Sequence, residues 1–137
     1  MADMIELMHT LAVAVQASTG IQAWCQTHYS QALMVSEGWD GQAPPGENDT
    51  PLVVFWPEDK LAGQNQALKI HNINVAVILW DETEPAAVDN VLVFSGQRNV
   101  EALRQLILEV IAANVPNTLR LAEVATEWDP IDQSPLY

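Results

Sequence analysis

The chain has 137 residues, of which 49% are hydrophobic and 17% charged, a composition typical of one folded domain and unlike that of a disordered chain. Eighteen acidic residues against five basic ones give a net charge of −13 at pH 7, and the five bases form no cluster. Because binding to a phosphate backbone depends on a basic patch, this charge argues against direct nucleic-acid binding.

The sequence also limits the cellular compartment. Its apolar stretches are shorter than the roughly 20 residues of a membrane span, and the acidic segment 1–6 is unlike the basic start of a signal peptide. Cys25 is the single cysteine, so no intrachain disulfide can form, and we expect a reducing compartment. These features predict a protein of the cytosol, or one assembled there, without a membrane partner.

A helix is predicted over residues 3–18, where Ile5, Met8, Ala12 and Val15 recur at helical spacing. Asp3 is placed to cap this helix, and Gly20 is placed to end it in a left-handed turn. His9 lies beside the apolar stripe, and we interpret it as a structural or surface residue and not as a ligand.

Residues 21–37 allow more than one interpretation. Ile21 to Cys25 fits either a short strand or a helical turn, whereas residues 32–35 resemble a strand. Cys25 and His28 have the C-x-x-H spacing of a zinc pair, but a zinc site needs four ligands and no second pair lies near in the sequence. We therefore expect no metal site.

A loop rich in glycine, proline and acidic residues is predicted over 38–50. Long loops in compact domains are often functional. Trp39 inside this loop fits two roles, an interface anchor or an aromatic ring folded back over the sheet, and the sequence leaves both open.

Two strands are predicted next, over 52–56 and over 68–80, and we expect them to pair antiparallel. In the second strand Ile73, Val75, Val77 and Leu79 alternate onto one side, which we expect to face the core. The following turn, 81–90, is acidic; it lacks the EF-hand pattern, so we expect solvated carboxylates and no calcium site.

A short apolar strand over 91–94 and a helix that ends near Asn114 follow. Asn99 is placed to cap the helix, and its buried stripe is predicted at Val100, Leu103, Ile107, Val110 and Ile111. Gly96 precedes it alone, without the glycine-rich loop of a phosphate site.

A last strand is predicted over 119–128, and an extended tail over 129–137 is free to pair with a sheet edge of another chain. The expected fold is α+β: one domain over residues 1–137, with a mostly antiparallel sheet of about four strands packed against two helices.

No catalytic motif accompanies this scaffold. The three histidines are scattered, no Gly-x-Ser-x-Gly elbow is present, and the carboxylates lie mainly in turns. We therefore predict no catalytic residues, no cofactor and no enzymatic activity.

Several short strings do suggest a family when they are taken in order. They are Pro-Leu-Val-Val-Phe-Trp-Pro at 51–57, Ser-Gly-Gln-Arg-Asn-Val-Glu-Ala-Leu at 95–103, Glu-Trp-Asp-Pro-Ile at 127–131 and Pro-Leu-Tyr at 135–137. With the order of elements, they make the chain resemble the tail terminator, or tail-completion, proteins of long-tailed bacteriophages, from about Met4 to Tyr137.

The resemblance implies a structural virion protein assembled in the host bacterial cytoplasm. Such a protein forms a homo-oligomeric ring, commonly a hexamer, at the head-proximal end of the tail. The ring caps the tail tube protein, stops polymerisation and joins a head–tail connector, while DNA passes through its lumen without specific binding.

We expect the contacts of such a ring to come from the loop 38–50, the acidic turn 81–90 and the C-terminal region. The expected interface residues are Trp39, Asp40, Glu47, Asp49, Asp81, Glu82, Glu84, Trp128, Asp129, Ile131, Leu136 and Tyr137. Other interpretations stay open: another connector or neck protein, an acidic DNA-mimicking inhibitor of a host defence enzyme, or a small enzyme or metal-binding domain.

Overall fold

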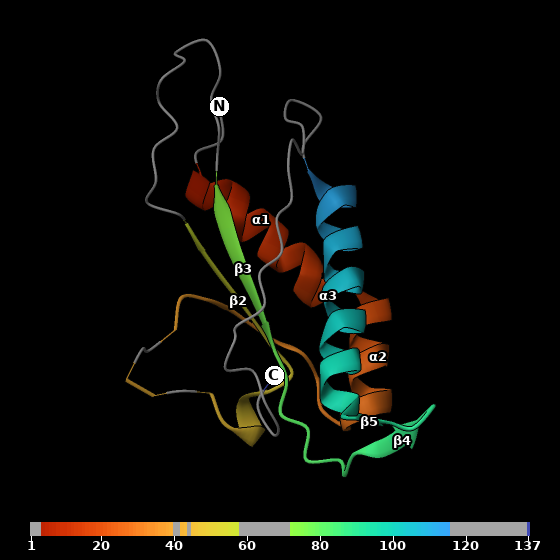
Figure 1. Cartoon of the computed structure of the whole chain (residues 1–137). Helices are drawn as coiled ribbons and strands as arrows, with labels where there is room; N and C mark the ends of the chain where they lie inside the picture. The colour runs from red at the N-terminus through yellow and green to blue at the C-terminus, as the bar shows by residue number, and fades with distance from the viewer. Residues whose placement is uncertain (1–3, 40–41, 44, 58–71, 116–136) are drawn as a thin grey trace.

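The computed structural model describes residues 4–39, 42–43, 45–57, 72–115 and 137 (Figure 1). The fold is α+β, as predicted. Its helices are α1 (Met4–Ala17), α2 (Thr19–Tyr29) and α3 (Ser95–Asn114), and a 3₁₀ turn spans Glu47–Asp49; its strands are β1 (Met34–Glu37), β2 (Leu52–Pro57), β3 (Ile73–Ile78), β4 (Ala86–Val88) and β5 (Val91–Val93).

The main sheet has the strand order β1-β2-β3. Strands β2 and β3 pair antiparallel, from Leu52 opposite Ile78 to Pro57 opposite Ile73, which confirms the predicted pairing. Strand β1 instead runs parallel to β2, with Met34 opposite Leu52. The sheet is therefore mixed.

The parallel pair explains the long loop that follows β1. Parallel neighbours can be joined only if the chain returns along the length of the strand, which takes about a dozen residues or more. Residues 38–51 make this return, and Trp39 and Pro45 lie beside Val54 of β2. The crossover loop thus occupies the sheet face that the helices leave open.

The helices cover the other face and form the core with it. Val53, Phe55 and Leu79 are fully buried there, and Ile73, Val75 and Val77 pack beside them, as the alternation in β3 predicted. The helices contribute Leu7, Met8, Leu11, Ala12 and Val15 from α1 and Val100, Leu103 and Ile107 from α3. Ile5 was expected in the first stripe but lies exposed.

The boundary between the first two helices differs from the prediction. Gly20 does not end α1 but lies inside α2, so the described residues form three α-helices where two were expected. The reason is Ser18, whose Oγ accepts a hydrogen bond from the backbone N–H of Ile21 at 3.3 Å. A serine at this position starts a new helix by satisfying one of its free N–H groups.

Helix α3 also begins earlier than predicted. Asn99 lies within it, because the helix already starts at Ser95. The side chain of Asn99 therefore does not cap the helix; it donates a hydrogen bond to the hydroxyl of Tyr29 at 2.9 Å.

A β-hairpin occupies part of the region that was predicted to be an acidic turn. Strands β4 and β5 pair antiparallel, with Val88 opposite Val91. Between them Asp89 and Asn90 have φ values of 51° and 64°. Two successive positive φ values are the mark of a type I′ turn, whose twist matches that of a two-stranded ribbon.

Several predictions fall wholly or partly outside the described residues: the cap at Asp3, the interface residue Asp40, the first part (68–71) of the strand over 68–80, the strand over 119–128 and the tail up to Leu136. None of the helices in the described part of the chain combines the length and the apolar character that a membrane crossing requires.

Candidate interaction surface

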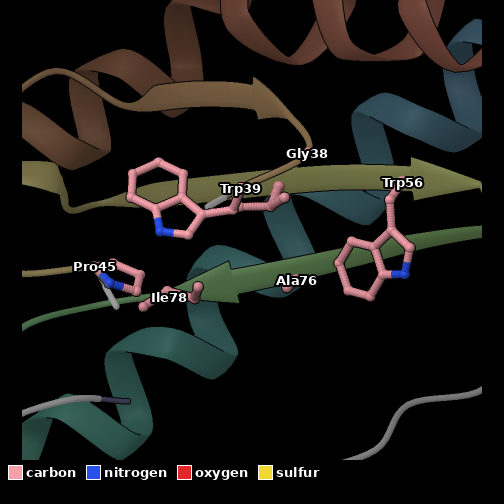
Figure 2. A pocket seen from close by; sticks show the side chains of 7 residues that line it. Gly38, Trp39, Pro45, Trp56, Ala76 and Ile78 are labelled. Atoms are coloured by element: carbon pink, nitrogen blue, oxygen red, sulfur yellow. The ribbon is translucent and has the colours of Figure 1, made fainter. Parts of the chain in front are cut away.

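An apolar groove lies on the open face of the main sheet, and Figure 2 shows it between Trp39 and Trp56. Its volume is about 380 Å³. The described residues that line it are Gly38, Trp39, Pro45, Val54, Trp56, Ala76 and Ile78.

The strand register explains why these side chains meet. Val54 pairs with Ala76, and Leu52 pairs with Ile78, so their side chains alternate onto the same face of the sheet. Ala76 has the smallest side chain of this set and leaves room above it. Trp56, two residues beyond Val54, stands on the same side as Val54.

The opposite wall comes from the crossover loop. Gly38 has a φ of 88°, a conformation that side chains rarely adopt, and it turns the chain out of β1. The indole Nε1 of Trp39 then donates a hydrogen bond to the carbonyl oxygen of Ala43 at 2.7 Å, which holds the ring in place. Trp39 is 37% exposed and Trp56 41% exposed.

Of the two roles considered for Trp39, the structure therefore shows the ring folded back over the sheet. Part of the ring stays exposed to solvent. An interface role for this residue is compatible with that position. None of the described residues that line the groove is charged, although the chain carries a net charge of −13. The described lining of the groove is thus apolar, on a strongly acidic protein.

Three of the predicted acidic interface residues lie at the surface, one in the 3₁₀ turn and two in the segment after β3. Glu47 and Glu84 are exposed, and Glu82 is exposed while its Oε1 accepts a hydrogen bond from Nε1 of Trp80 at 3.0 Å. Asp49 is half-buried and accepts from the backbone N–H of Gly46 at 2.9 Å.

Asp81 differs from the prediction of a solvated turn, because its side chain is buried. Its carboxylate accepts hydrogen bonds from the hydroxyl of Tyr29 at 2.7 Å, from the backbone N–H of Thr83 at 2.8 Å and from Oγ of Ser95 at 3.3 Å. Asp81 therefore joins α2, the segment after β3 and the start of α3 in one polar network, which also includes Asn99.

This network shifts two pKa values in opposite directions. Burial by itself would raise the pKa of Asp81, but the hydrogen bonds from Thr83, Tyr29 and Ser95 outweigh it and hold the pKa below its ordinary value. Burial, together with the bond to the Asp81 carboxylate, raises the pKa of the Tyr29 hydroxyl well above its ordinary value. Both groups keep their usual protonation states at neutral pH.

A polar hollow of about 370 Å³ lies beside the network. The carboxylate of Asp81 is already bonded by three donors within the chain. We therefore interpret the network as a structural joint between α2, α3 and the segment after β3.

Tyr137 is also buried, and not on the surface as the interface prediction had it. Its backbone and that of Leu79 exchange two hydrogen bonds, at 2.6 and 2.7 Å. Its ring lies against Gly96, where an added Cβ would come within 2.2 Å of the ring carbon Cε2. The missing side chain at Gly96 makes room for this ring, a role that the sequence did not reveal.

The pair with C-x-x-H spacing is divided between core and surface. Cys25 is fully buried, and burial raises the pKa of its thiol to about 11. His28 is exposed and its ring stacks on Trp24, with 4.3 Å between the ring centroids.

The remaining predicted interface residues, Asp40, Trp128, Asp129, Ile131 and Leu136, lie outside the described residues. Sequence reasoning missed Trp56 and the hairpin residues Val91 and Leu92, which are exposed. A signal was present in both cases: Trp56 continues the alternation of β2, and Asp-Asn is a dipeptide that tolerates positive φ.

Comparisons of the chain with protein-family models, with curated proteins and with solved structures found no match.

Proposed function

We propose that this chain is a structural virion protein, a tail terminator that forms a ring on the head-proximal end of a phage tail tube. The observation that carries the proposal is the groove between Trp39 and Trp56. It offers a half-open, uncharged surface on a chain of net charge −13, and half-exposed aromatic residues are typical anchors of protein–protein contacts.

The charge supports a ring around DNA. Copies of an acidic chain repel one another, so stable contacts between them must use the uncharged parts of the surface. Carboxylates such as Glu47, Glu82 and Glu84 stay exposed. A lumen lined by such groups would let DNA pass without binding it.

The α+β fold class supports the proposal, because the resemblance of the sequence to tail terminator proteins implies it. In such a ring the partners are further copies of this chain, the tail tube protein and a head–tail connector. The protein would be found in the virion, after assembly in the host bacterial cytoplasm.

The test combines native mass with tube capping. Sedimentation velocity is run on the purified chain over a range of concentrations, alone and with tail tubes from the same phage. We expect a ring of about six chains of 15.1 kDa, and electron microscopy should show a density at one end of each tube.

Tube length gives a second readout. When the chain is added during polymerisation of the tube protein, tubes should become shorter as its concentration rises. A chain that stays monomeric with tubes and leaves their length unchanged would contradict the proposal. A ring that ignores tubes but binds the head connector would identify a neck protein instead.

A further inference from the structure

The strands of the hairpin β4–β5 form another apolar surface in the described part of the chain. It projects from the body beside α3 in Figure 1, and Val91 is 60% and Leu92 64% exposed. An isolated two-stranded ribbon is only marginally stable in water. Large apolar side chains exposed on such a ribbon are typical of a contact site.

The pairing of the hairpin defines its two faces. Val88 and Val91 are opposite each other and share one face, whereas Ala87 and Leu92 share the other. Both faces are therefore apolar. Among residues 86–93, Asp89 in the turn is the one charged residue.

We infer that the hairpin of one copy docks into the groove between Trp39 and Trp56 of the next copy. This inference rests on the proposed ring and supplies its contact between subunits. The first reason is charge: both strands of the hairpin and the described lining residues of the groove are apolar, so two chains of net charge −13 can meet there with Asp89 in the turn as the one charged group among these residues.

A basic partner is a poorer occupant of the groove, because the described lining residues offer it no carboxylate. Such a partner would be attracted to the acidic surface around Glu47 and Glu82, which line the polar hollow beside Asp81. A second copy of this chain, by contrast, brings an apolar hairpin of its own.

The second reason is placement. In Figure 1 the segment after β1 lies on the left and the hairpin projects at the lower right, and the described lining residues of the groove include none from the hairpin. The hairpin therefore does not fill the groove within one chain. Two different patches of a subunit make a head-to-tail contact, which closes into a ring when the rotation between copies allows it.

The test uses the full chain and blocks one surface at a time. Val91→Glu blocks the hairpin, and Trp56→Glu blocks the groove. Each places a carboxylate where the contact would bury it without a partner, so association should weaken by more than about 100-fold. Val91 is mostly exposed and Trp56 is partly exposed in the single chain, so thermal unfolding of the monomer should change little.

Val13→Glu is the matched control, because Val13 is also a half-exposed valine, at 50%, but lies on α1. We expect Val13→Glu to associate as the unmodified chain does. If it weakened association as much as Val91→Glu, the effect would come from added charge and not from the hairpin, and the inference would be wrong.

Mixing the two blocked variants is the decisive step. The Trp56→Glu chain keeps a hairpin and the Val91→Glu chain keeps a groove, so together they can make one good contact and no more. Sedimentation should show each variant alone as a monomer and the mixture as a dimer of twice the 15.1 kDa chain mass. A mixture that stays monomeric, or variants that still form rings, would overturn the inference.

The outcomes separate this inference from the proposed function. Rings that depend on Val91 and Trp56 but do not cap tail tubes would support the contact and remove the tail terminator role. Rings that cap tubes and still form with both substitutions would support the tail terminator role and overturn the contact between hairpin and groove. An unmodified chain that is monomeric at every concentration, with and without tubes, would contradict both.

Discussion

The same strands make both faces of the β1–β2–β3 sheet, yet the two faces differ in their exposure to solvent. On the helix-covered face Phe55 and its neighbours are sealed from water. On the other face Val54 is covered, while Trp56 stays partly exposed. The difference shows that burial depends on what the chain connections cover: two helices close one face, and a single crossover loop leaves a groove in the other.

The largest expected loss of stability comes from a substitution on the helix-covered face of the sheet. Phe55→Ala should lower the free energy of unfolding by about 3–5 kcal/mol, because it removes a fully buried ring and leaves a cavity. Urea denaturation followed by circular dichroism measures this change. A loss below about 1 kcal/mol would mean that the helices do not seal this face.

The second largest loss of stability should come from the polar network around Asp81. Asp81→Asn keeps the shape of the side chain but disturbs three hydrogen bonds, so we expect a loss of about 1–3 kcal/mol near neutral pH. Glu82→Gln is the control, since Glu82 is an exposed carboxylate next to it; its effect should stay within about 0.5 kcal/mol.

The pH dependence of this loss has a definite sign. The folded chain lowers the pKa of Asp81 from 3.8, so the ionised carboxylate stabilises the fold above that pH and the stabilisation disappears as the pH falls through the lowered value. The difference between the unmodified chain and Asp81→Asn should therefore shrink between about pH 5 and pH 3. A difference that grows toward acid would contradict the network.

The contact between Tyr137 and Gly96 tests how the end of the helix-covered face is closed. Gly96→Ala would normally favour a helix by up to about 1 kcal/mol. Here the new Cβ meets the Tyr137 ring, so we expect a net loss of about 1–2 kcal/mol. In a double-mutant cycle with Tyr137→Ala the two losses should not add; additive losses would show that the ring does not lie against Gly96.

The smallest expected change in stability is on the open face. Trp56→Ala should alter the free energy of unfolding by less than about 1 kcal/mol, because the ring is already partly in water. Native mass should respond far more strongly, with assembly lost. A loss of stability as large as that of Phe55→Ala would mean that the groove is part of the core.

The central pair of strands could be predicted from sequence because its signals are local. In β3 Ile73, Val75 and Val77 repeat at period two, whereas β2 follows from the continuous apolar run 52–56, and the structure packs Val53, Phe55, Val75 and Val77 in the core. The stripe from Val100 to Ile107 was predictable for the same reason, since helical spacing follows from the sequence alone.

Other features depend on contacts between residues far apart in the chain. Nothing in residues 34–37 indicates that β1 runs parallel to β2. The burial of Asp81 follows from Tyr29, which lies 52 residues away. The function of Gly96 depends on Tyr137. The start of α2 after Ser18 was a different kind of error, because a serine is a local N-cap signal, which the nearby Gly20 obscured.

The parallel pairing of β1 with β2 has a consequence for folding kinetics. A hairpin closed by a tight turn, such as β4–β5, forms within about 1–10 microseconds. The groove needs the whole crossover from residue 38 to residue 51 and the non-local pairing of three strands, which is a slower process. The hairpin of a newly made chain would thus form quickly but only transiently by itself, whereas the groove would exist only in chains that have completed the sheet. Incompletely folded chains would then be unable to receive a neighbour.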